Sequence, residues 1–135
     1  MALTRYVSPV EFREALKRAK HSVFNRKVAA GLHEYSLREY SEMRTFLGPQ
    51  GRSGYAIKPD GDLVNLFSWA SGEGQALIAD AVSNGAHKLD CYDGPLVEIY
   101  KRAGFVEVRR EPFDPSIAGH YPWGQPDVVY MEYRR

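Results

Sequence analysis

The residues best suited to chemistry form a glycine-rich stretch, Ser71-Gly72-Glu73-Gly74-Gln75, which lies between two apolar runs. The run before it, Leu63–Ser68, is typical of a strand, and the run after it, Ala76–Val82, is typical of a helix. The first turn of a helix has N–H groups without partners inside the helix, and these groups carry the positive end of the helix dipole. A strand, a glycine-rich turn and a helix in this order therefore predict a phosphate group held by backbone amides.

This stretch fits neither of two common nucleotide-binding motifs. A P-loop requires Gly-Lys followed by Ser or Thr, whereas Gly74 is followed by Gln75-Ala76. A dinucleotide fingerprint requires a third glycine where this chain has Leu77. A turn of this kind is also common as a plain helix entry without a ligand, so that alternative stays open at this point.

Capping and turn signals predict the elements that position the glycine-rich stretch. Ser8–Glu11 and Ser36–Glu39 have the pattern of a capping box, and they predict helices over 9–23 and from 36 to the Gly48-Pro49 stop. Turn residues between 55–57 and 63–67 predict a β-hairpin. The other expected elements are strands at 4–7, 87–92, 105–110 and 127–133, helices at 76–82 and 95–103, and a long loop at 112–126.

Length and composition limit the class of protein. The chain of 135 residues is one domain's worth, and 44% hydrophobic with 26% charged residues is typical of a globular protein. A net charge of +1 argues against a dedicated nucleic-acid or membrane-surface binder, and no apolar run is long enough to span a bilayer. A single cysteine excludes an internal disulfide and suits a reducing cytoplasm, where we expect this protein.

A second sequence pattern, which includes Tyr100, Gly104 and Phe105, follows the predicted strand at 87–92. The chain resembles the GNAT superfamily of N-acetyltransferases, whose coenzyme A loop has the form R/Q-x-x-G-x-G/A and corresponds here to 71–76, with Ser71 in the leading position. The family's next signature is an Asn, an Ala and then Tyr-x-x-x-Gly-Phe. Tyr100, Gly104 and Phe105 match it, whereas Asp93 and Leu96 depart from it. Segments 89–94 and 126–131 also resemble compact GNAT-like proteins of phages and prophages.

The resemblance implies an α/β (α+β) fold in one domain over residues 1–135. We expect a mixed central sheet of about six strands with helices on both faces and two splayed parallel strands, 63–68 and 87–92, in the middle. Acetyl-CoA would lie between these strands and pass its acetyl group to a primary amine in a ternary complex, without a metal ion. The acceptor amine would belong to a protein lysine, a protein N-terminus or a small molecule.

The resemblance also implies roles for named residues. Tyr100 would protonate the departing thiolate as a general acid. A backbone N–H near 66–68 would polarise the acetyl carbonyl. The expected cofactor contacts are Leu66, Phe67, Ser68, Ser71, Gly72, Glu73, Gly74, Gln75, Ala76 and Asp93.

Two other functions stay open. Ser71 and Asp93 favour a GNAT-shaped protein that acts by binding a partner protein, with little or no catalysis. Basic residues crowd the first helix and its exit, and they indicate either a solvated face or a contact with an acidic partner or with nucleic-acid phosphates. These residues are Arg13, Lys17, Arg18, Lys20, Arg26 and Lys27.

Several single residues have an ordinary interpretation beside a chemical one. Tyr100 suits a helix core, Asp93 suits a helix cap, and Cys91 suits a small buried hydrophobe rather than a nucleophile. The four histidines show no metal-ligand spacing, and His120 is a weak candidate for a base. The last strand is apolar on both faces, which favours a covered strand and a homodimer.

Overall fold

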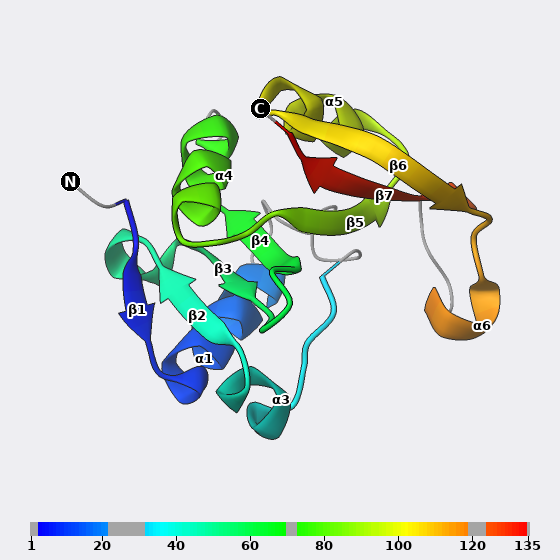
Figure 1. The fold of residues 1–135 in the computed structure, drawn as a ribbon. Helices are drawn as coiled ribbons and strands as arrows, with labels where there is room; N and C mark the ends of the chain where they lie inside the picture. The colour runs from blue at the N-terminus through cyan, green and yellow to red at the C-terminus, as the bar shows by residue number, and fades with distance from the viewer. Residues whose placement is uncertain (1–2, 22–31, 70–72, 119–123, 135) are drawn as a thin grey trace.

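The computed structural model describes residues 3–21, 32–69, 73–118 and 124–134 (Figure 1). Its elements, in chain order, are β1 (Arg5–Val7), α1 (Pro9–His21), α3 (Leu37–Ser41), β2 (Arg44–Leu47), a single 3₁₀ turn (Pro49–Gly51), β3 (Ser53–Ile57), β4 (Leu63–Ser68), α4 (Gly74–Ser83), β5 (Lys88–Tyr92), α5 (Pro95–Arg102), β6 (Phe105–Glu111), α6 (Pro115–Ala118) and β7 (Val128–Tyr133).

The strands form two antiparallel sheets that meet at β4 and β5. The first sheet has the order β1-β2-β3-β4 and the second has the order β5-β7-β6. In the described part of the chain, β4 and β5 are joined by one parallel bridge, between Asp62 and Lys88, at the point where both strands begin. The two parallel strands then part, which confirms the predicted α/β fold with splayed strands in the middle.

Helices cover the sheets from two sides. Apolar side chains of α1 and α3 pack on one side of the first sheet in a cluster with Ala56 and Phe67. Apolar side chains of α4 and α5 pack on the other side in a cluster that also holds Leu89, Phe105 and Met131 from the second sheet. The alternation of side chains along each strand therefore separates an α1/α3 side from an α4/α5 side. Figure 1 shows α1 and α3 lying together, away from α4 and α5.

The predicted second helix is wrong over its second half. The capping box at its start is present, because Ser36 Oγ accepts from the Glu39 N–H at 3.1 Å and Glu39 Oε1 accepts from the Ser36 N–H at 3.0 Å. The helix nevertheless ends at Ser41, and 44–47 forms β2. Pairing explains the difference, because β2 lies between β1 and β3 and hydrogen-bonds to both.

Most other elements match the prediction. The hairpin forms with Ile57 opposite Leu63, and Gly61 takes the positive φ of 88° that its turn needs. The first helix is described as far as His21, so the end predicted at residue 23 lies outside the described residues. The predicted loop 112–126 contains the short helix α6, and residues 119–123 of it lie outside the described residues. No helix in the described ranges is long and apolar enough to cross a membrane.

Candidate active site

The divergence of β4 from β5 follows an irregularity inside β4. The register with β3 shifts between Gly54 and Ala56, so that two residues of β4 face one residue of β3. Asn65 occupies this bulge with a φ of 54°. A bulge bends the strand that carries it. The end of β4 therefore pairs with β3 along one edge and diverges from β5 along the other.

The start of α4 lies directly beyond this edge. The first hydrogen bond of the helix runs from the Leu77 N–H to the Glu73 carbonyl at 3.0 Å, so the amides of Gly74, Gln75 and Ala76 have no acceptor inside the helix. Ser68 Oγ donates to Glu73 Oε2 at 2.9 Å, which joins the end of β4 to the beginning of α4. Ser71 and Gly72, two of the predicted cofactor contacts, lie outside the described residues.

The first turn of α4 also contacts α5. Gln75 Nε2 donates to the backbone carbonyl of Ile99 at 2.8 Å, and the Gly74 backbone approaches the Ile99 side chain. Ile99 is the neighbour of Tyr100. The structure therefore brings the predicted cofactor residues of β4 and α4 close to the helix that carries the predicted acid.

Tyr100 lies on the buried side of α5, and only 7% of its surface is exposed. Its ring packs edge-on against Phe105, with 5.8 Å between ring centroids. Burial raises the pKa of its phenol, and its neighbours Cys91 and Asp90 act in the same direction. The phenol therefore stays protonated at neutral pH, as a proton donor must before it reacts.

Cys91 shares these surroundings. Burial, with smaller effects from Asp90 and Asp93, raises the pKa of its thiol to about 12. A protonated thiol is a poor nucleophile, so the chemistry of Cys91 favours the ordinary interpretation of a partly buried packing residue. The same effect would make any thiolate formed beside Tyr100 strongly basic and ready to accept a proton.

Asp93 is engaged by an arginine from the second sheet. Arg110 Nη1 lies 3.0 Å from Asp93 Oδ2, and the same guanidinium pairs with Glu107 at 2.8 Å and Asp127 at 3.4 Å. The N-cap of α5 is Gly94, and no side-chain hydrogen bond caps the first turn of this helix. The interpretation of Asp93 as a helix cap is therefore wrong. A contact between Asp93 and the cofactor stays a prediction.

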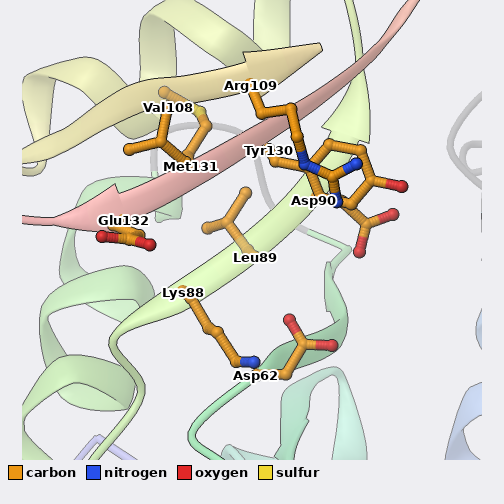
Figure 2. Close-up of a pocket in the computed structure, with 9 residues that line it drawn as sticks. All are labelled: Asp62, Lys88, Leu89, Asp90, Val108, Arg109, Tyr130, Met131 and Glu132. Atoms are coloured by element: carbon orange, nitrogen blue, oxygen red, sulfur yellow. The ribbon is translucent and has the colours of Figure 1, made fainter. Parts of the chain in front are cut away.

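A pocket of about 280 Å³ opens on the other side of the second sheet (Figure 2). Leu89 and Met131 point into the core with α4 and α5, so the alternating residues Lys88, Asp90 and Tyr130 point the opposite way. The full lining is Asp62, Lys88, Leu89, Asp90, Val108, Arg109, Tyr130, Met131 and Glu132.

Charges in this pocket are unequally paired. Lys88 pairs with Asp60 at 2.9 Å, and Arg109 pairs with Glu111 and lies over the Tyr130 ring. Asp90 forms no ion pair with any residue that the structure describes. Burial raises the pKa of Asp62 to about 6, and its nearest cation, Lys58, is 3.9 Å away. Asp90 is therefore a pocket carboxylate that a cationic ligand would satisfy.

Solved structures of three acetyltransferases resemble this chain. An acetyltransferase of the GNAT family from Streptococcus pneumoniae aligns with a TM-score of 0.57 and 19% identity over 96% of both chains. A variant spermidine N-acetyltransferase from Vibrio cholerae aligns with a TM-score of 0.63 and 17% identity over 96% of this chain and 93% of that chain. A GCN5-related N-acetyltransferase from Kribbella flavida aligns with a TM-score of 0.59 and 16% identity over 98% of this chain and 96% of that chain.

The fold is that of the GNAT acetyltransferases. No family model matches the sequence, and no curated protein matches it. At these identities the likeness establishes the GNAT fold, and the narrower resemblance to phage and prophage proteins stays a prediction.

Sequence reasoning missed the pocket residues of this GNAT fold. Asp62 was missed because it follows turn residues that are ordinary in a hairpin. Asp90 was missed because it lies within a short, mostly apolar strand. The available signal was alternation, because a carboxylate between Leu89 and Cys91 must face away from the core that those two residues enter. In the described ranges no three His, Cys, Asp or Glu side chains form a group that could hold a metal ion, and His120 lies outside those ranges.

Proposed function

We propose that this protein is an N-acetyltransferase that transfers an acetyl group from acetyl-CoA to a primary amine. The observation that carries the proposal is the divergence of β4 from β5 directly beside the free amides of α4. In this arrangement the backbone of β4 suits the extended arm of a cofactor, and the N-terminus of α4 suits the pyrophosphate at the end of that arm.

Acetyl-CoA supplies the acetyl group as an activated thioester. The backbone of Leu66–Ser68 would pair with its pantetheine arm, and the amides of Gly74, Gln75 and Ala76 would hold its pyrophosphate. Ser71, Gly72 and Glu73 are proposed contacts of the same loop. The divergence of β4 from β5 and the absence of a side chain at Gly74 support this fit.

The chemical step requires one proton donor on the α4/α5 side. The amine nitrogen forms the new C–N bond as the C–S bond breaks, and Tyr100 donates its proton to the sulfur. The amine loses a proton in the same reaction, and that proton restores the phenol. The products are an amide and a free thiol, so atoms and charge balance without a metal ion.

The acceptor would approach from the pocket on the opposite face. Asp90 has no ion pair in the described structure, and the carboxylate of Asp62 is partly buried. The pocket therefore favours an acceptor amine that belongs to a cationic molecule. One structure with this fold is a spermidine N-acetyltransferase, which supports a small cationic amine over a protein acceptor. A homodimer and a cytoplasmic location remain proposals beside this one.

Calorimetry followed by a turnover assay tests the function. Acetyl-CoA should bind with micromolar affinity, whereas NADH, which has a pyrophosphate but no pantetheine arm, should bind much more weakly. Thiol release should then depend on an added amine, and small polyamines should be better acceptors than lysine peptides. Absence of acetyl-CoA binding at millimolar concentration would overturn the proposal. Binding without turnover on any amine would favour the non-catalytic partner-binding protein.

A further inference from the structure

Asn65 combines an unusual backbone with a fully engaged side chain. It lies in the middle of β4 with a φ of 54°, and only 8% of its surface is exposed. Left-handed backbone is uncommon for residues other than glycine, although asparagine tolerates it better than most. In the middle of a strand, such a residue must be held by its surroundings.

Hydrogen bonds from the α1/α3 side hold the Asn65 side chain. The Tyr40 hydroxyl donates to Asn65 Oδ1 at 2.7 Å, and Asn65 Nδ2 donates to the His33 carbonyl at 2.7 Å. The same Tyr40 hydroxyl accepts from the Tyr35 N–H at 3.2 Å. The Asn65 amide and the Tyr40 hydroxyl therefore fasten segment 33–35 at two points.

Segment 33–35 is connected to the pocket through Lys58. The Tyr35 ring packs edge-on against His33 at 4.5 Å and accepts the Lys58 ammonium over its face at 5.3 Å. Lys58 in turn pairs with the pocket residue Asp62 at 3.9 Å. A continuous set of contacts thus runs from the bulge in β4 to the wall of the pocket.

We propose that Asn65 is a positioning residue that couples the two sides of the sheet. Its left-handed backbone turns Leu66–Ser68 away from β5 on the α4/α5 side, and its amide holds segment 33–35, which is linked to the pocket through Lys58, on the other side. The inference rests on the proposed function where it assigns the first side to acetyl-CoA and the second to the acceptor amine. One residue then sets the geometry of both substrates.

Substitutions at Asn65 separate the backbone role from the amide role. Asn65→Gly keeps the left-handed conformation and loses both side-chain hydrogen bonds, so the KM for the amine should rise about tenfold while the affinity for acetyl-CoA stays near wild type. Asn65→Ala loses both features, so the affinity for acetyl-CoA should fall as well. Asn65→Asp keeps the acceptor for Tyr40 and loses the donor to His33, so its KM should be intermediate.

A matched control is Asn84→Ala. Asn84 Nδ2 donates to the hydroxyl of another buried tyrosine, Tyr55, at 2.8 Å, and Tyr55 packs in the α4/α5 cluster whereas Tyr35 packs against the α1/α3 cluster. This variant should lose stability without changing either substrate parameter. Hydrogen exchange gives a readout that needs no substrate, because the Tyr35 amide should exchange faster in Asn65→Gly and remain unchanged in Asn84→Ala.

The outcomes separate this inference from the proposed function. If wild type neither binds acetyl-CoA nor turns over, the proposed function fails, and the Tyr35 amide still decides whether Asn65 holds segment 33–35. An unchanged Tyr35 amide in Asn65→Gly overturns the amide role. Equal loss of acetyl-CoA affinity in Asn65→Gly and Asn65→Ala overturns the backbone role.

Discussion

Asp62 immediately precedes β4 and Asp90 lies on β5, and the charge of Asp90 adds to burial in raising the pKa of Asp62 to about 6 from a usual value of 3.8. Between these two pH values the folded state binds more protons at Asp62 than the unfolded state does. Asp62 therefore contributes most to the free energy of unfolding at a pH below its unfolded-state pKa of 3.8. That contribution is lost as the pH rises through its folded-state pKa of about 6.

Asp62→Asn should remove this pH dependence. A neutral side chain avoids the cost of a buried charge, so the free energy of unfolding at about pH 7 should rise by about 1–2 kcal/mol, less whatever the weak pair with Lys58 contributes. Urea unfolding at a series of pH values measures the effect.

Asp60→Asn is the control for this prediction. Its carboxylate is exposed, and a hydrogen bond from Lys88 lowers its pKa, so its loss should act in the opposite direction. An unchanged slope between about pH 4 and pH 6 in Asp62→Asn would show that Asp62 is not held in a desolvated site.

Tyr100→Phe should lower kcat by at least about 10²-fold and leave acetyl-CoA binding unchanged. No hydrogen bond to the hydroxyl is present in the described structure, so the melting temperature should also stay unchanged. Tyr133→Phe is a matched control, because Tyr133 packs against the same Phe105 ring without a proposed chemical role. Steady-state kinetics and calorimetry check both variants, and full activity in Tyr100→Phe would remove Tyr100 from the mechanism.

Gly74→Ala should separate cofactor binding from folding. Among the described residues, a Cβ at this position would meet Ile99 Cγ2 alone, at an ordinary 3.8 Å, so stability should be kept or slightly raised. Affinity for acetyl-CoA should fall, since the new methyl group stands among the amides proposed for the pyrophosphate. Calorimetry that shows wild-type affinity in this variant would argue against that cradle.

Gly54→Ala should have the reverse profile. Its Cβ would lie 2.5 Å from the Phe46 carbonyl oxygen and 2.8 Å from a Leu47 methyl group, which the paired strands cannot easily relieve. We expect a loss of roughly 1–3 kcal/mol in the free energy of unfolding. Chemical denaturation checks this value, and a stable variant would mean that β2 and β3 can move apart.

Ser36→Ala should test the capping box that starts α3. The variant loses the hydrogen bond to the Glu39 N–H, and the expected cost is about 1 kcal/mol in the free energy of unfolding. Ser41→Ala removes only an exposed bond to the Arg38 carbonyl and should have a much smaller effect. Thermal denaturation of the pair decides whether the cap contributes, and equal shifts would contradict it.

The helices and strands around the site could be predicted because local turn and cap residues mark where they begin and end. Gly61 and Gly85 have the positive φ that ends a turn or a helix, and Pro95 begins α5. The element boundaries between residues 55 and 110 could therefore be predicted from single residues. β2 could not be predicted in this way. Leu47 continues the helical spacing of Tyr40 and Met43 and also suits a buried strand. Only the pairing of β2 with both of its neighbours decides between the two structures.

The candidate site was predictable on one side only. Glycines and Tyr100 marked the α4/α5 side through a sequence pattern, whereas the pocket side depends on residues far apart in the chain. Asp62 and Asp90 come together through a parallel bridge that no local signal encodes. The engagement of Asp93 by Arg110 has the same origin, since it depends on how β6 lies across β7 from the end of β5.

The position of β7 between β5 and β6 has a consequence for how the molecule is made. On the ribosome, β5 and β6 emerge with no strand to pair with until β7 has followed them, while the first sheet can already close. One wall of the site is thus assembled early and the other late. A nascent chain paused before β7 should have a protease-resistant amino-terminal half and a second half that is cut readily.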